Sequence, residues 1–177
     1  MTFFTALWKS RPEHGAAATI YVAIVAQARQ AAFYLNYGVP DTVDGRFDLI
    51  ILHAMLVMRR LRREGAKGQD IAQALFDYMF SDMDRSLREM GVGDMSIGKH
   101  VKKMAKAFYS RAAQCEQGLD GNDDVLTAAL ASSLFRAKAA GQESLQLMAT
   151  YLRGTDKDLD GVPVVEIEAG RLPWRVP

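Results

Sequence analysis

The segment FDLIILHAMLVMRRLRR (residues 47–63) is one of the two most apolar parts of the chain. Between Leu49 and Met58 every side of a helix built from it would be apolar, except at His53. Such a helix has to be covered around most of its circumference, so we predict that it lies at the centre of a bundle. Alternatively, part of it lies at the surface and binds an apolar client. The side chains that would then contact the client are Leu49, Leu52, Met55, Leu56 and Met58.

Helical periodicity extends from this segment in both directions. We expect six helices, at about residues 13–37, 44–64, 69–90, 94–117, 122–140 and 143–153. Gly38, Gly65 and Gly91 follow the first three, as glycine commonly does at helix ends. The helical period is lost after Gly154. We therefore predict an all-α, single-domain bundle of about six helices with an extended C-terminal tail.

The predicted bundle divides the chain into three parts. Residues 1–15 are expected to form a leader or a short amphipathic helix, residues 16–153 the helical domain, and residues 154–177 an extended acidic tail. The leader contains FFTALW (residues 3–8), whose apolar side chains recur four residues apart and are followed by basic residues. It would either dock on the bundle or insert into a membrane interface.

Composition indicates a soluble, cytoplasmic protein. The chain has 177 residues, a usual length for one domain. The apolar runs 16–26 and 48–58 are each about half of the roughly 20 residues that cross a bilayer. The N-terminus lacks the basic region of a signal peptide. Cys115 is the only cysteine, which fits a reducing compartment.

A short stretch resembles a nucleotide-binding loop. In GVGDMSIGKH (residues 91–100), Gly93, Gly98 and Lys99 have the spacing of the P-loop G-x-x-x-x-G-K-[ST]. However, His100 replaces the hydroxyl residue that holds magnesium, and the preceding segment is an amphipathic helix rather than a buried strand. We therefore interpret this stretch as a connector between two helices.

A second stretch resembles half of a calcium-binding loop. Asp156, Asp158 and Asp160 match D-x-D-x-D-G, but the twelfth position, which requires a bidentate glutamate, is Ile167. We interpret it as a solvated acidic turn. No combination of serine, cysteine, histidine or carboxylate side chains has the spacing of a catalytic or metal site. We expect no enzyme activity, no metal and no cofactor.

Two basic clusters are candidates for contact with an anionic surface such as lipid headgroups, RNA phosphates or an acidic protein. The first cluster ends the central helix and consists of Arg59, Arg60, Arg62 and Arg63. The second follows one face of the fourth helix and consists of Lys99, Lys102, Lys103 and Lys106. The alternative is that both are ordinary solvated faces. No aromatic residues alternate with the lysines, so stacking on nucleic-acid bases is not expected.

Two long segments, residues 23–65 and 75–111, resemble the ubiquinol–cytochrome c chaperone family. The motifs GVPDTVDGRFDL and FSDMDRSLREMGVGD carry this resemblance, which covers about residues 16–120. The family includes a mitochondrial assembly factor for cytochrome b and relatives in alphaproteobacteria. The resemblance implies a non-catalytic helical chaperone that helps new cytochrome b to assemble into the ubiquinol–cytochrome c reductase (bc1) complex.

The same resemblance suggests partners and a location. Mitochondrial members work with a small partner chaperone and contact the translating ribosome. We expect cytochrome b as the client of this chain, with a small partner chaperone, the ribosome or an anionic membrane surface as further contacts. The expected location is cytoplasmic and peripheral at the inner face of the cytoplasmic membrane. The alternative function is a membrane- or ribosome-associated adaptor for a different client.

Overall fold

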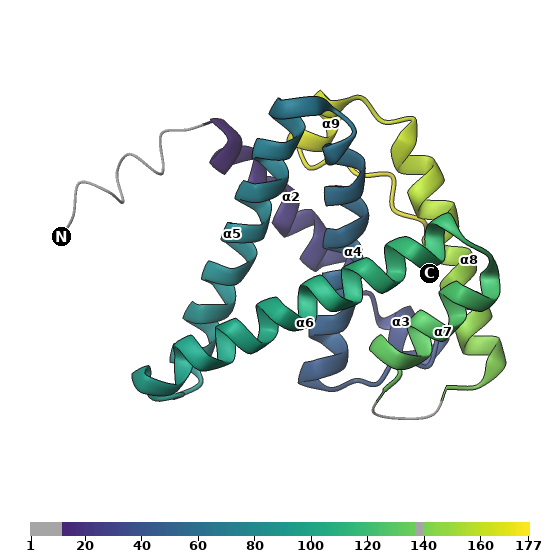
Figure 1. Ribbon diagram of the computed structural model, residues 1–177, viewed down its shortest axis with the longest axis horizontal. Coiled ribbons are helices and arrows are strands. Elements are labelled where there is room, and N and C mark those ends of the chain that lie inside the picture. Colours follow the sequence, from purple (N-terminus) through teal and green to yellow (C-terminus); the bar gives the residue numbers. More distant parts are fainter. Residues whose placement is uncertain (1–11, 137–139) are drawn as a thin grey trace.

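The computed structural model describes residues 12–136 and 140–177, and within these ranges it consists of helices, turns and loops (Figure 1). The helices are α2 (Pro12–Ala28), α3 (Ala31–Leu35), α4 (Val43–Arg62), α5 (Gly65–Glu89), α6 (Asp94–Asp120), α7 (Asp123–Ser133), α8 (Gln142–Asp160) and α9 (Val164–Glu168). The prediction of an all-α, single-domain bundle is confirmed.

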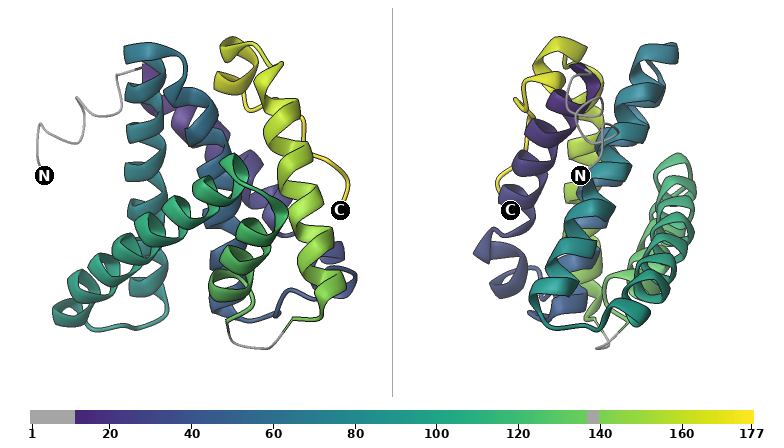
Figure 2. Two further views of the ribbon diagram at one scale, coloured as in Figure 1. Left: turned by 45° about the vertical axis from the view of Figure 1, so that its right-hand side comes forward. Right: turned by 90° about the vertical axis from the view of Figure 1, so that its left-hand side faces the viewer.

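Helix α4 is the central element. It packs against α2, α5, α6 and α8, and α2 and α6 lie on opposite sides of α5 in the right-hand view of Figure 2. Every residue from Asp48 to Met58 is buried. This confirms the prediction that the apolar segment forms the middle of the bundle, because only a helix surrounded on all sides buries its whole circumference.

The first expected helix is divided in two. Helix α2 ends at Ala28 and α3 starts at Ala31, although no glycine or proline lies between them. Phe33 is fully buried, and Tyr34 Oη donates a hydrogen bond to the Ala28 carbonyl at 2.8 Å. The break lets α3 change direction and insert Phe33 into the core, while Tyr34 satisfies a carbonyl at the end of α2.

The C-terminal region is more helical than its sequence predicts. Helix α8 continues to Asp160 and α9 covers residues 164–168, so the expectation of an extended tail from residue 154 was wrong over both segments. Leu152, Thr155 and Leu159 are buried, and they continue one face of α8 beyond Gly154. Only the last residues are extended; we call residues 171–177 the C-terminal strap.

The stretch that resembles a P-loop joins two helices, as predicted. Helix α5 ends at Glu89, Gly91 adopts a φ of +81°, and Gly93 is the N-cap of α6. Lys99 lies within the first turns of α6. The hairpin formed by α5 and α6 projects at the lower left of Figure 1.

Candidate interaction surfaces

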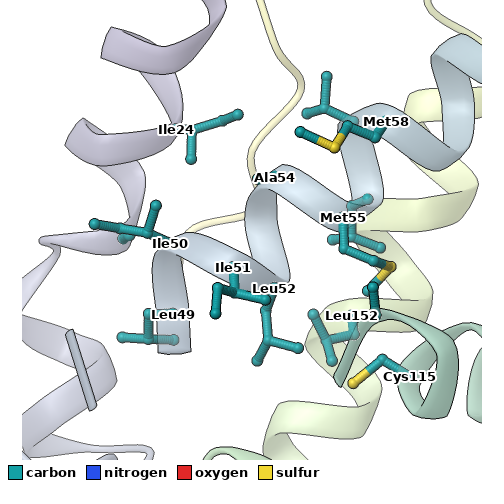
Figure 3. Close-up of a cluster of buried hydrophobic side chains, with 14 of the residues drawn as sticks. Ile24, Leu49, Ile50, Ile51, Leu52, Ala54, Met55, Met58, Cys115 and Leu152 are labelled. Atoms are coloured by element: carbon teal, nitrogen blue, oxygen red, sulfur yellow. The ribbon is translucent and has the colours of Figure 1, made fainter. Parts of the chain in front are cut away.

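The apolar residues considered for client binding lie inside the bundle. Leu49, Leu52, Met55, Leu56 and Met58 are each at most 3% exposed. Figure 3 shows Leu49, Leu52, Met55 and Met58 among side chains from neighbouring helices, including Ile24, Cys115 and Leu152. A client cannot reach them in this arrangement, so client binding by α4 stays a prediction that requires the bundle to open.

His53, the one polar residue between Leu49 and Met58, is part of a buried hydrogen-bond chain. Its Nδ1 lies 2.7 Å from the Leu49 carbonyl and its Nε2 lies 2.8 Å from Tyr151 Oη. Because a carbonyl only accepts, Nδ1 carries the proton and Nε2 accepts from the tyrosine hydroxyl. Burial lowers the pKa of His53 to about 4, which keeps the ring neutral. His53 therefore serves packing and hydrogen bonding in the core.

The C-terminal strap closes this chain of hydrogen bonds. Gln27 Nε2 donates to Tyr151 Oη at 3.0 Å and to the Arg175 carbonyl at 2.9 Å. The Trp174 ring lies edge-on to His53, with centroids 5.1 Å apart. Arg175 also donates to both carboxylate oxygens of Asp158. The strap is thus held by backbone, aromatic and charged contacts to α2, α4 and α8.

The arginine cluster at the end of α4 is engaged within the molecule. Arg59 pairs with Asp120 and Asp156. Arg60 is buried, pairs with Glu64, and donates to the carbonyls of Leu159 and Val162. Arg62 pairs with Glu116, and Arg63 with Asp160. These contacts join α4 to α6 and to the end of α8, which leaves this cluster with little free charge for an external anion.

The four lysines of α6, which we call the lysine stripe, behave differently. Lys99, Lys102, Lys103 and Lys106 are all exposed, and no ion pair engages them among the described residues. Arg29 is the single arginine in residues 12–136 and 140–177 without a carboxylate partner. Unpaired cations therefore concentrate on one helix of the α5–α6 hairpin.

Sequence reasoning missed a buried ionic cluster beside the stripe. Asp48 is 2% exposed and pairs with Arg111 and Arg136, the latter at 3.2 Å. Burial raises the pKa of Asp48 to about 6, although both guanidinium groups act to lower it. The available signal in the sequence was an aspartate directly before the apolar run that forms the centre of α4. The N-cap of α4 is Thr42, so Asp48 has no capping role.

The acidic stretch that resembles a calcium-binding loop is helical in the structure. Asp156, Asp158 and Asp160 lie on α8, and each pairs with an arginine. Across the described residues no cluster of three or more histidine, cysteine or acidic side chains is suited to a metal ion. Within the same ranges no helix has the length and apolar composition needed to cross a membrane. The leader segment FFTALW lies outside the described residues.

Comparison with known proteins identifies the family. A sequence model of the ubiquinol-cytochrome C chaperone family matches residues 35–174. The chain therefore belongs to this family, whose members are assembly factors of the ubiquinol–cytochrome c reductase complex. The match extends through Trp174, beyond the part of the chain that carried the resemblance in sequence.

Individual relatives agree with this assignment. The chain is 27% identical to ubiquinol-cytochrome c reductase complex assembly factor 1 of Mus musculus, over 90% of this chain and 55% of that protein. For the Homo sapiens protein of the same name, the identity is 27% over 90% of this chain and 54% of the relative. The chain thus spans about half the length of these two relatives.

A solved structure matches almost the whole chain. The crystal structure of the Cbp3 homolog from Brucella abortus is similar, with a TM-score of 0.81 and 30% sequence identity. The match covers 99% of this chain and 97% of that one. The helical arrangement described above is therefore that of a Cbp3-type protein.

Proposed function

We propose that the protein is a non-catalytic assembly chaperone for cytochrome b of the ubiquinol–cytochrome c reductase, and that it holds apolar client segments near the membrane. Membership of the assembly-factor family is the observation that carries the proposal. The apolar residues of α4 pack in the core, and the lysine stripe lies on an exposed surface. This arrangement favours a protein that acts by binding another molecule. A small partner chaperone and a peripheral position at the inner face of the cytoplasmic membrane belong to the same proposal.

Gene deletion in the source organism tests this function. Loss of the protein should lower membrane-bound cytochrome b and reductase activity while the cytochrome b transcript stays at its normal level. Re-expression of the full chain should restore both. Unchanged cytochrome b in the deletion strain would rule the function out.

The client position requires a separate test because the α4 candidates are buried. Hydrogen–deuterium exchange of residues 49–58 should increase when a peptide of a cytochrome b transmembrane segment binds. Opening of the bundle would expose the backbone amides of α4 to solvent and remove their protection from exchange. Photoreactive residues at the exposed positions Tyr109 on α6 and Val22 on α2 report binding to the closed bundle instead. Binding with α4 fully protected would assign the client to another surface.

An adaptor bound to a membrane or ribosome is the second candidate, and the lysine stripe favours it. Changing Lys99, Lys102, Lys103 and Lys106 to glutamate should abolish cosedimentation with anionic vesicles or ribosomes at low salt. The double variant Arg29→Glu with Lys157→Glu, which alters cations off the stripe, serves as the control. If the stripe variant cosediments as well as this control, the stripe is only a solvated face.

A further inference from the structure

A cleft beside the lysine stripe combines apolar walls with cationic groups. It has a volume of about 270 Å³ and lies between the start of α4, the end of α5, the middle of α6 and Arg136. Val43, Phe47, Leu87 and Met104 supply its apolar lining. This volume is slightly below the roughly 300–1,000 Å³ of sites that enclose a whole drug-sized ligand. The cleft therefore fits a head group with the first part of a chain.

The charged lining leaves an excess of positive charge. Lys103, Arg111 and Arg136 carry three positive charges, whereas Asp44 and the buried Asp48 carry at most two negative ones. Asp44 is 77% exposed, so water screens it more than it screens the side chain of Arg111, which is 11% exposed. An anion in the cleft would meet a net attraction.

Hydrogen-bond donors remain available in the cleft. Arg111 uses its Nη1 on Asp48, and Arg136 directs its Nη2 at Asp44 and Asp48. A guanidinium group has five N–H donors, so both arginines keep donors for a further acceptor. Lys103 adds an ammonium group with no ion-pair partner among the described residues. Guanidinium and ammonium groups together are the usual ligands of a phosphate.

We propose that this cleft binds the phosphate of an acidic phospholipid, with the adjoining glycerol and methylene groups against Phe47, Leu87 and Met104. The remaining lysines of the stripe, Lys99, Lys102 and Lys106, face the surrounding anionic bilayer. This inference rests on the membrane contact proposed above. The apolar walls favour a lipid over RNA, because a sugar–phosphate backbone offers them less apolar surface than the glycerol and methylene groups of a lipid. In addition, no aromatic residues alternate with the lysines for base stacking.

A titration with a monomeric lipid tests the cleft apart from the membrane. The full chain, with labelled Met, Leu and Val methyl groups, receives short-chain phosphatidylglycerol below its micelle concentration. The methyl signals of Met104, Leu87 and Val43 should shift, while those of Leu147 on α8 and the buried Met79 stay constant. Phosphatidylcholine of the same chain length and inorganic phosphate should each bind at least about tenfold more weakly, because each lacks either the net charge or the apolar part.

Substitutions of opposite sign sharpen the test. Arg136→Gln and Lys103→Gln should each weaken phosphatidylglycerol binding about tenfold, whereas Asp44→Asn should strengthen it severalfold by removing a competing carboxylate. Arg29→Gln removes an equal charge beside α3 and should have no effect. These four positions are exposed, so the variants are expected to fold. Arg111→Gln is avoided because it would remove the hydrogen-bonded guanidinium partner of the buried Asp48 and leave it only the pair with Arg136.

Several results would overturn the inference. Constant cleft methyl signals, equal binding of phosphatidylcholine, or an Arg136→Gln effect no larger than that of Arg29→Gln would each do so. An RNA oligonucleotide that displaces the lipid and shifts the same methyl signals with a higher affinity would assign the cleft to a ribosomal contact instead. Vesicle cosedimentation and cytochrome b levels are measured independently. The cleft and the chaperone function can therefore fail separately.

Discussion

His53 and Asp48 lie five residues apart on α4, and their contributions to stability respond to pH in opposite directions. Burial depresses the pKa of His53 from 6.5 to about 4 and raises that of Asp48 from 3.8 to about 6. The His53 contribution to stability is present above about pH 6.5 and is lost as the pH falls towards 4. The Asp48 contribution is present below about pH 4 and is lost as the pH rises towards 6. The two slopes therefore nearly cancel between these values.

Single substitutions should reveal each slope. In Asp48→Asn the free energy of unfolding should rise between pH 4 and pH 6 more steeply than in the unmodified protein, by up to about 1.4 kcal/mol per pH unit. His53→Gln should change the slope in the other direction. Urea unfolding at intervals of pH measures both. Only the slopes are compared, because either change also alters stability at every pH; parallel curves for all three proteins would contradict the assignment.

Two glycines of α6 differ in the space around them. A Cβ on Gly118 would lie 2.7 Å from the Leu126 Cα of α7, whereas nothing lies within 4 Å of a Cβ on Gly98. Gly118→Ala should lower the free energy of unfolding by roughly 1–3 kcal/mol, because backbone atoms have to move. Gly98→Ala should raise it by up to about 1 kcal/mol through helix propensity. Thermal or urea unfolding compares the two, and effects of the same sign would contradict this packing.

At the level of elements, Trp174 is one of the residues that attach the C-terminal strap to the bundle. Its indole Nε1 is buried and has no hydrogen-bond partner among the described residues, while its ring covers His53. Trp174→Ala should lower the free energy of unfolding by about 2–4 kcal/mol and raise the pKa of His53, because water would enter. Trp174→Phe should cost much less, since it keeps a ring and removes the unsatisfied donor.

The strap also provides its own control. Val176 is 93% exposed, so Val176→Ala should leave both the unfolding transition and the titration of the His53 ring unchanged. Nuclear magnetic resonance of the histidine ring follows the titration directly. If Trp174→Ala leaves His53 at the same low pKa, the strap does not protect the buried hydrogen-bond chain.

At the scale of the whole molecule, paired arginines and unpaired lysines should respond differently to salt. Raising the ionic strength from about 0.1 M to about 1 M shortens the Debye length from about 10 Å to about 3 Å. Vesicle binding through the lysine stripe should then fall at least about tenfold. The free energy of unfolding should change by less, because partly exposed ion pairs contribute at most about 1 kcal/mol each. Cosedimentation and urea unfolding in the same buffers measure both, and salt-independent vesicle binding would contradict the electrostatic contact.

Parts of the fold could be predicted because their signals are local. The glycine turn before α6 is defined by a few neighbouring residues, and it is present as expected. The break between α2 and α3 had no such signal, because it depends on Phe33 meeting His53 and Tyr151 from distant helices. The same holds for Asp48, whose arginine partner Arg111 is 63 residues away.

The sequence by itself determined that the protein is an all-helical bundle around α4, because apolar periodicity depends on side chains one or two turns apart. The tertiary structure alone decided which basic cluster is free. At the end of α4, Arg59, Arg62 and Arg63 meet carboxylates that lie 54 to 97 residues away, whereas the lysines of α6 meet none among the described residues. Whether a charge is neutralised depends on which helices come together, and no local pattern encodes that.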